Sequence, residues 1–251
     1  MMNLIIWNCR GALKPSLKSH VQDLFIDDDP TILIIMETHI GGDRAKEIFD
    51  TLPFQGAIHT DTVGYAGGLW FLWNPDRVEV TNLASTEQEI HALVKVRSSN
   101  LSWIFTAIYG SPRHRERCML WENLYVVANI HNLSWIIAGD FNELMSNDDK
   151  FGGRPVNLSR ALSFKECMDA CNMADLEFQG PRFTWSNGHS VSSLIQEMLE
   201  RFFANPDWCM LYPEAQVSHL TRCFSKHCPV LLDLHPQSNF RLEKPFKFQS
   251  F

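Results

Sequence analysis

The stretch Trp135-Ile-Ile-Ala-Gly-Asp-Phe-Asn142 is a short apolar run that ends in Gly139 and two polar residues, Asp140 and Asn142. Four apolar residues bounded by glycine predict a strand that is buried on both faces. The end of such a strand would bring a carboxylate and a carboxamide to the rim of a sheet, where functional groups often lie. Asp and Asn also favour plain turns, because their side chains bond to nearby backbone groups. Taken alone, the stretch leaves both interpretations open.

Other apolar runs also lie next to a polar residue. Asn8 follows the run 4–7, Glu37 follows 31–36, Tyr109 follows 103–108, and His227 precedes 230–234. If the strands lie side by side, these polar groups converge on one rim and form a cleft. A carboxylate such as Glu37 suits Mg²⁺, which takes one or two carboxylates and keeps several waters that a phosphate can replace. Histidine and aspartate can manage the protons and the water of phosphodiester hydrolysis.

The chain combines many short strands with few helices. Helical spacing predicts helices over 17–25, 44–52, 116–131 and 159–171, the last with Ser159 as its N-cap. The alternation over 90–97 predicts a half-exposed strand, and about ten strands are expected in all. Because the helices are too few to cross over each strand, the pattern favours two packed β-sheets with helices on their outer faces.

Composition limits the class of protein. A chain of 251 residues with 45% hydrophobic content is long enough for one large domain. The formal net charge of -7 means that contact with nucleic acid would need a local basic patch or a bound metal ion. The seven cysteines are scattered and lack zinc-site spacing, which indicates reduced thiols. No apolar run has the length of a signal peptide's core or a membrane span, so we expect a soluble, intracellular protein that does not enter membranes.

A basic cluster lies at the start of the predicted helix 116–131. It consists of Arg113, His114, Arg115 and Arg117. Positive charge near a helix N-terminus interacts unfavourably with the helix dipole, so the position of this cluster needs an explanation. One explanation is contact with a phosphate, for which Arg113 is the candidate, and the other is a solvated helix start.

Short motifs occur in a fixed order along the chain. They are Trp7-Asn-Cys-Arg-Gly11, Glu37-Thr38, Gly67-Gly-Leu-Trp70, Tyr109-Gly-Ser-Pro112, Gly139-Asp-Phe-Asn-Glu143, Phe183-Thr-Trp-Ser-Asn187, Arg201-Phe-Phe-Ala-Asn205 followed by Trp208, and His227-Cys-Pro-Val230. Together they resemble the endonuclease/exonuclease/phosphatase superfamily, in the branch found as the N-terminal endonuclease of plant non-LTR (LINE-type) retrotransposon polyproteins. We expect residues 1–236 to form this domain. The tail 237–251 resembles the segment that joins the endonuclease to a reverse transcriptase, which is absent here.

The resemblance implies a DNase I-like, four-layer α/β/β/α sandwich that hydrolyses DNA phosphodiesters with Mg²⁺, or with Mn²⁺ in its place. Carried over by position, Asn8 and Glu37 would hold the metal. Asp140 would orient or deprotonate the attacking water, while Asn142 and Tyr109 would position the scissile phosphate.

The remaining roles implied by the resemblance concern charge and substrate contact. His227 would hydrogen-bond the phosphate and stabilise the charge that develops on it. Trp185 lies where the family has an aromatic near the substrate, and stacking beside a nucleotide and packing in the core are both open. Nuclear residence is implied by the resemblance alone.

Two positions depart from the family pattern. Glu200 stands in Met198-Leu-Glu-Arg201 where the family has the Asp that orients the histidine, and Glu is one methylene longer. Lys226 stands in Ser225-Lys-His227 where the family has Ser-Asp-His, a change of two charge units beside the metal and the phosphate. A displacement of about 1 Å can cost on the order of a hundredfold in rate. The hypothesis is that the fold and cleft survive while catalysis is weakened or lost, although Lys226 could turn to solvent or bind the phosphate.

Two further interpretations belong to other functional classes. The sandwich could be an inactive module that binds nucleic acid or protein, or it could hydrolyse a phospholipid or inositol phosphate as superfamily relatives do. The lack of an apolar membrane-binding stretch weighs against a lipid substrate.

Overall fold

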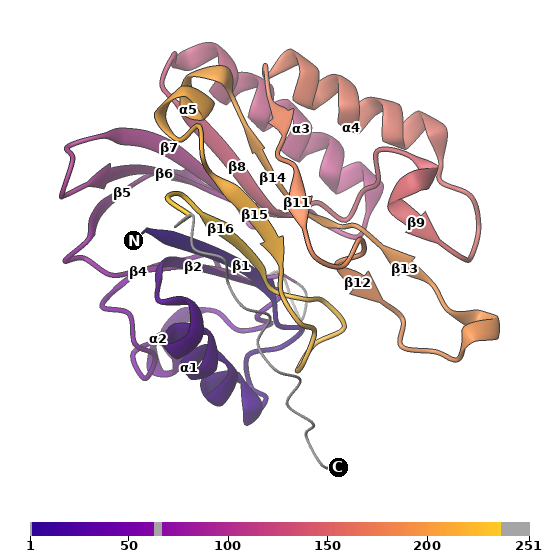
Figure 1. The fold of residues 1–251 in the computed structure, drawn as a ribbon, viewed down its shortest axis with the longest axis horizontal. Coiled ribbons are helices and arrows are strands. Elements are labelled where there is room, and N and C mark those ends of the chain that lie inside the picture. The colour runs from indigo at the N-terminus through magenta and orange to yellow at the C-terminus, as the bar shows by residue number, and fades with distance from the viewer. Residues whose placement is uncertain (1, 63–66, 237–251) are drawn as a thin grey trace.

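The computed structural model describes residues 2–62 and 67–236, which form two large β-sheets with helices outside them (Figure 1). The proposed tail 237–251 lies outside the described residues. The seven-stranded sheet has the order β11-β15-β16-β1-β2-β4-β3. Its strands are β1 (Asn3–Asn8), β2 (Pro30–Met36), β3 (Gly56–His59), β4 (Leu69–Trp73), β11 (Phe178–Gln179), β15 (Gln216–His219) and β16 (Val230–Asp233).

The second large sheet has six strands in the order β10-β14-β8-β7-β6-β5. They are β5 (Val78–Ser85), β6 (Glu89–Val96), β7 (Ser102–Tyr109), β8 (Trp135–Asp140), β10 (Ala174–Asp175) and β14 (Glu200–Ala204). A small third sheet joins β9 (Lys150–Phe151), β12 (Trp185–Ser186) and β13 (Gln196–Glu197). The helices are α1 (Ser16–Asp28), α2 (Gly42–Phe49), α3 (His114–Ile130), α4 (Leu158–Ala170) and α5 (Pro206–Leu211), with 3-10 turns η1 (Asn147–Asp149) and η2 (Val191–Ser193).

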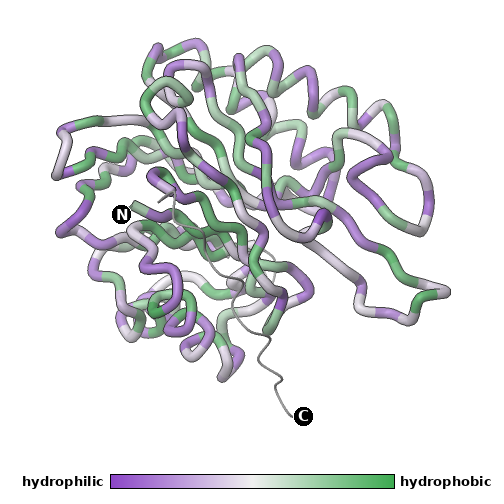
Figure 2. Tube along the Cα trace, in the orientation of Figure 1, coloured by the Kyte–Doolittle hydropathy of each residue, from purple (hydrophilic) through white to green (hydrophobic). Residues whose placement is uncertain are grey.

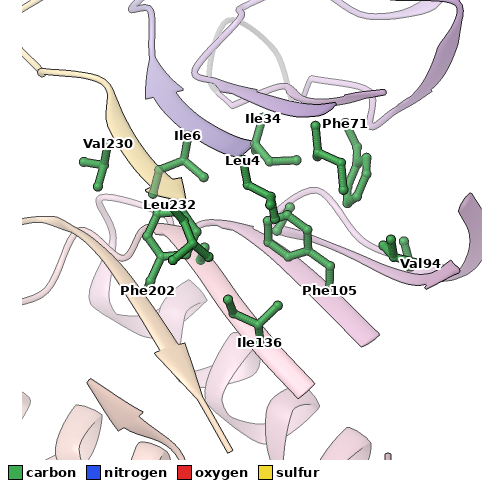
Figure 3. Packing of buried hydrophobic residues seen from close by; sticks show 14 of the residues in the cluster. Leu4, Ile6, Ile34, Phe71, Val94, Phe105, Ile136, Phe202, Val230 and Leu232 are labelled. Carbon is green, nitrogen blue, oxygen red and sulfur yellow. The ribbon is translucent and has the colours of Figure 1, made fainter. Parts of the chain in front are cut away.

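The layers follow from where apolar side chains point. In Figure 3, Leu4, Ile6 and Ile34 of one sheet face Phe105, Ile136 and Phe202 of the other. The opposite face of the first sheet packs against α1 and α2, and that of the second packs against α3 and α4. The central strands such as β1, β2 and β8 are therefore buried on both faces, while the outer helices alternate in character along their length (Figure 2). This arrangement is the expected four-layer α/β/β/α sandwich.

Strand direction brings the polar strand ends together. β1 runs parallel to β2 with Asn8 opposite Met36, and β7 runs parallel to β8 with Tyr109 opposite Asp140. The antiparallel β14 begins with Glu200 opposite Asp140. The antiparallel β16 pairs Val230 with Ile6 of β1, so the segment before it runs along the end of β1. All of these ends lie at one rim of the two sheets.

Several predicted details were wrong. Among the described residues there are sixteen strands rather than about ten, because five of them are only two residues long. Helix α3 begins at His114 and not at 116, and α5 was not predicted. Helix α4 is capped by Asn157, whose side chain accepts a hydrogen bond from Arg160 N, and not by Ser159.

The strand predicted to be half exposed over 90–97 is buried along much of its polar face. Its counterpart β6 buries Glu89 and His91, because α3 lies over them and Asn123 Nδ2 donates to Glu89 Oε1 at 2.7 Å. His91 Nδ1 is 2.8 Å from Thr106 Oγ1, which makes it a satisfied structural histidine. All seven cysteines are free. No helix among the described residues is long and apolar enough to cross a membrane.

Candidate active site

Asp140 is at the centre of the rim and is fully buried. Its Oδ2 accepts a hydrogen bond from Asn8 Nδ2 at 2.8 Å, and its Oδ1 accepts one from Asn142 N at 2.9 Å. Asn8 belongs to one large sheet and Asp140 to the other, so the first of these bonds joins the two sheets. A carboxylate offers about four lone-pair positions. Asp140 therefore keeps acceptor capacity for a water or a substrate proton.

His227 and Glu200 form the second element of the rim. His227 Nδ1 lies 2.5 Å from Glu200 Oε1 and 3.7 Å from Asp140 Oδ2. Glu200 thus reaches the imidazole despite its extra methylene, and the misplacement expected from the longer side chain is absent. Because Nδ1 is engaged, Nε2 is the ring nitrogen left for a ligand.

The backbone around His227 holds the imidazole in place from both sides. Cys228 N donates to Thr184 O at 2.8 Å, and Ser186 N donates to Lys226 O at 3.0 Å. Thr184 Oγ1 also accepts from Glu200 N at 3.2 Å. One segment therefore fixes both members of the Glu200–His227 pair.

Burial and neighbouring charges shift the pKa values of three groups at the rim, Asp140, His227 and Tyr109. Burial and the neighbouring Glu200 carboxylate raise the pKa of Asp140 to about 7. Burial lowers the pKa of His227, but the carboxylates of Glu200, Asp140 and Glu37 together more than offset this, and the net direction is upward. Burial, with the Glu37 and Asp140 carboxylates, raises the pKa of Tyr109. The rim therefore combines an imidazole whose pKa is raised, a protonated phenol and a carboxyl group whose pKa lies near neutral pH.

Glu37 lies at the more open part of the rim. Its Oε1 is 3.3 Å from His39 Nε2 and 3.9 Å from Arg10 Nε. It raises the pKa of both Tyr109 and His227, so its carboxylate faces the same cleft as those side chains.

Backbone strain is concentrated here. The residues Arg10, Glu37, His39 and Asn142 all have φ values between 48° and 59°, in the left-handed region. Such conformations cost on the order of 1 kcal/mol each and gather at functional sites. Arg10 and His39 were not predicted as neighbours of Glu37, and only His39 is close to it along the chain.

The donors at this rim fit a hard divalent cation. Asn8 Oδ1 and the Glu37 carboxylate are oxygen ligands of the kind Mg²⁺ takes with waters completing its shell. Asp140, Glu200 and His227 also have ligand atoms within 4.8 Å of one another. In that second group Glu200 Oε1 contacts His227 and both Asp140 oxygens accept hydrogen bonds, but the buried Glu200 Oε2 has no hydrogen-bond partner among the described residues. The rim therefore offers two sets of donors for a cation, Asn8 with Glu37 and Asp140 with Glu200 and His227.

Behind the rim, a buried ion pair connects the two loops that carry Tyr109 and Asn142. Arg117 is fully buried, donates from Nη1 to Ser111 O at 2.5 Å and lies with Nη2 2.6 Å from Glu143 Oε2. Sequence reasoning missed this pair, although Arg117 starts the spacing Leu120, Trp121 and Leu124 of the buried face of α3.

The three expected substrate-binding residues lie in different settings. Arg113 is exposed and pairs with Glu116 at 2.8 Å, and Glu116 in the first turn of α3 offsets the basic cluster there. Trp185 is half buried, with its ring 6.4 Å from that of His227. Lys226 is exposed and lines a pocket with Arg10 and Lys14. The structure brings Trp185 and Lys226 next to His227, while Arg113 lines a separate pocket with Tyr109.

The sequence model of the Endonuclease/Exonuclease/phosphatase family matches residues 5–224. The chain belongs to this family. Its members are nucleases and phosphatases that in general depend on a divalent metal ion. No sequence match was found among curated proteins.

Solved structures of other proteins share the fold. The AP endonuclease LMAP from Leishmania major superposes with a TM-score of 0.72 at 17% identity, over 92% of this chain and 86% of its own. The endonuclease domain of TRAS1, a telomere-specific non-LTR retrotransposon, gives 0.70 at 13% identity, over 95% and 100%. The 3′ phosphatase NExo from Neisseria, bound to a product DNA hairpin, gives 0.66 at 16% identity, over 93% and 99%. The predicted family and sandwich fold are therefore confirmed.

Proposed function

We propose that this protein is a Mg²⁺-dependent phosphodiester hydrolase that nicks DNA, of the type found in retroelements. The observation that carries the proposal is the chain of contacts Asn8–Asp140–His227–Glu200 across the two sheets at one rim. Neighbours of the same fold include the endonuclease domain of a non-LTR retrotransposon and a phosphatase bound to DNA, which favours a DNA substrate.

Asn8 and Glu37 would hold the cation. When bound, Mg²⁺ would neutralise phosphate charge and help to orient the substrate. Asn8 ends β1 and Glu37 directly follows the parallel strand β2, so the fold sets their spacing before any ligand binds. Mn²⁺ takes the same oxygen ligands and would support the reaction in place of Mg²⁺.

Asp140 would orient the attacking water and accept its proton. A general base is most effective when its pKa lies near the working pH, and the pKa of about 7 meets this condition. His227 would stabilise the charge that develops on the phosphate. A protonated imidazole donates from both nitrogens, so Nδ1 can stay on Glu200 while Nε2 faces the substrate.

Asn142 and Tyr109 would position the scissile phosphate. Asn142 Nδ2 donates to Gly110 O at 2.8 Å, which ties the residue after β8 to the residue after Tyr109. The raised pKa of Tyr109 keeps its hydroxyl protonated and able to donate a hydrogen bond. Trp185, beside His227, would then flank the bound strand.

Of the two departures from the family pattern, Lys226 is the one that we expect to affect the rate of hydrolysis. Glu200 makes its contact with His227, whereas Lys226 adds a positive charge one residue from the imidazole. Positive charge near the metal site opposes cation binding. We infer that the protein is active with a weakened affinity for Mg²⁺, and that Lys226→Asp lowers the Mg²⁺ concentration needed for half-maximal rate.

The test is nicking of supercoiled plasmid as a function of Mg²⁺. The wild type should nick, and Glu37→Gln should abolish nicking, whereas Glu47→Gln, an exposed residue of α2, should not change it. Absence of wild-type nicking at every Mg²⁺ concentration would contradict the hydrolase. Retained DNA binding in that case would favour an inactive binding module.

A further inference from the structure

A pocket with a cavity volume of ≈ 490 Å³ lies beside the rim. We call it the basic pocket, and its lining residues come from the loop after β1 and the loop before β16: Arg10, Lys14, Cys223, Phe224, Ser225 and Lys226. Half of these side chains are cations and none is an acid, in a chain with a formal net charge of -7. The pocket therefore concentrates positive charge that the surface as a whole lacks.

The two loops of the basic pocket also carry residues of the candidate active site. Arg10 follows Asn8 by two positions and donates from its backbone N to Asn8 Oδ1 at 3.1 Å. Arg10 Nε lies 3.9 Å from Glu37 Oε1, and Lys226 directly precedes His227. A nucleic-acid strand whose scissile phosphate lies at His227 would therefore pass a neighbouring phosphate over the pocket.

The two lysines of the pocket are available to an anion. Among the described lysines only Lys150 forms an ion pair, so neither Lys14 nor Lys226 is neutralised by a carboxylate of the described chain. Lys14 Nζ donates to Cys9 O at 3.0 Å, which holds it against the loop after β1. Lys226 is exposed and keeps all its donors for a ligand.

Phe224 adds an aromatic face that the core holds in place. Its ring lies 4.6 Å from that of the buried His20, which in turn packs 4.5 Å from Trp7 of β1. The side chain is nevertheless 40% exposed. Cationic side chains with an aromatic face are the composition by which proteins bind a nucleic-acid strand.

We propose that the basic pocket binds the nucleotide next to the scissile phosphodiester, with its phosphate on Lys226, Arg10 and Lys14 and its sugar or base against Phe224. This inference rests on the proposed function and adds a second contact point on the same strand. It gives Lys226 a role in substrate affinity, since the bound phosphate supplies the negative charge that the protein does not place beside this lysine.

The test is the salt dependence of DNA binding without divalent metal, so that no hydrolysis can occur. Anisotropy of a labelled short duplex in EDTA gives the binding constant as salt varies from about 50 to about 200 mM. Each lost phosphate contact lowers the steepness of the plot of log K against log salt by about 0.9. Over this salt range, the binding constant then falls about 3.5-fold less. Lys226→Ala should lower the slope by this amount and Lys226→Glu by more. Lys165→Ala, the same change on the exposed face of α4, should leave it unchanged.

The possible results separate this inference from the proposed function. Slopes that stay at the wild-type value in both Lys226 variants overturn the basic pocket, even when the wild type nicks plasmid. If the slopes change as expected but the protein never nicks plasmid, the result supports the basic pocket as a phosphate site and refutes the proposed hydrolase. A wild type that does not bind DNA at all overturns both.

Discussion

Replacing Glu200 with Gln tests the electrostatic coupling at the rim. Gln has the same shape and still offers an oxygen to His227 Nδ1, so the imidazole keeps its orientation while one negative charge is lost. The ligand atoms of Glu200, Asp140 and His227 all lie within 4.8 Å of one another. At that separation and an effective dielectric of about 20, two unit charges interact by roughly 3.5 kcal/mol.

This energy sets the size of the expected change in the pH profile. An interaction of that size corresponds to roughly 2.5 pH units, since one unit is worth about 1.36 kcal/mol. Burial, the larger cause of the raised pKa of Asp140, stays in the variant, so the change should be smaller than this limit. We expect the acid limb of the rate profile, set by ionisation of Asp140, to move down by about 1–2 pH units.

The basic limb of the rate profile should also move to lower pH. The pKa of His227 is raised by Glu200, and the uncharged Gln removes that effect, so the imidazole loses its proton at a lower pH than in the wild type. The assay is the initial rate of plasmid nicking across the pH range for wild type, Glu200→Gln and a control, Glu79→Gln, on the exposed face of the edge strand β5. A loss of rate with both limbs in place would refute the reasoning.

Two further predictions concern the scaffold that positions the rim. A Cβ at Gly139, where φ is 154°, would lie 1.9 Å from Ile108 O, so Gly139→Ala should push β7 and β8 apart and cost at least about 2 kcal/mol in urea unfolding. An unchanged unfolding midpoint would contradict this. Arg117→Met should lower the free energy of unfolding by about 3 kcal/mol, because the buried carboxylate of Glu143 loses one of its partners. Adding Glu143→Gln should recover part of this loss. Strictly additive effects of the two changes would contradict the buried pair.

The sequence predicted the features that depend on hydrophobic pattern and strand ends. Apolar runs that stop at Asn8, Glu37, Tyr109 and Asp140 gave the strands, and the surplus of strands over helices gave the two sheets. Two-residue strands such as β9 and β12 were missed, because a periodicity needs more residues than they contain. Helix α5 did carry a signal, since Asn205 and Pro206 are a typical N-cap and first helical residue.

Contacts between residues far apart in the chain could not be predicted from the hydrophobic pattern. Hydrophobic pattern does not show that Asn8 donates to Asp140, because this contact depends on how the two sheets pack, and only the family resemblance pointed to the contact of Glu200 with His227. The same holds for Arg117, which was grouped with an exposed basic cluster and is fully buried. The family resemblance assigned roles to residues, and the fold supplied the distances between them.

The central claim is that a divalent cation binds at the Asn8–Glu37 edge of the rim. The most direct measurement is a crystal structure of the protein soaked in Mn²⁺, with the ion located by its anomalous scattering. We predict one ion coordinated by the Glu37 carboxylate and Asn8 Oδ1, at metal–oxygen distances of about 2.0–2.3 Å, and no ion there in Glu37→Gln. An ion held instead between Asp140, Glu200 and His227, or no ion at the rim, would contradict the account.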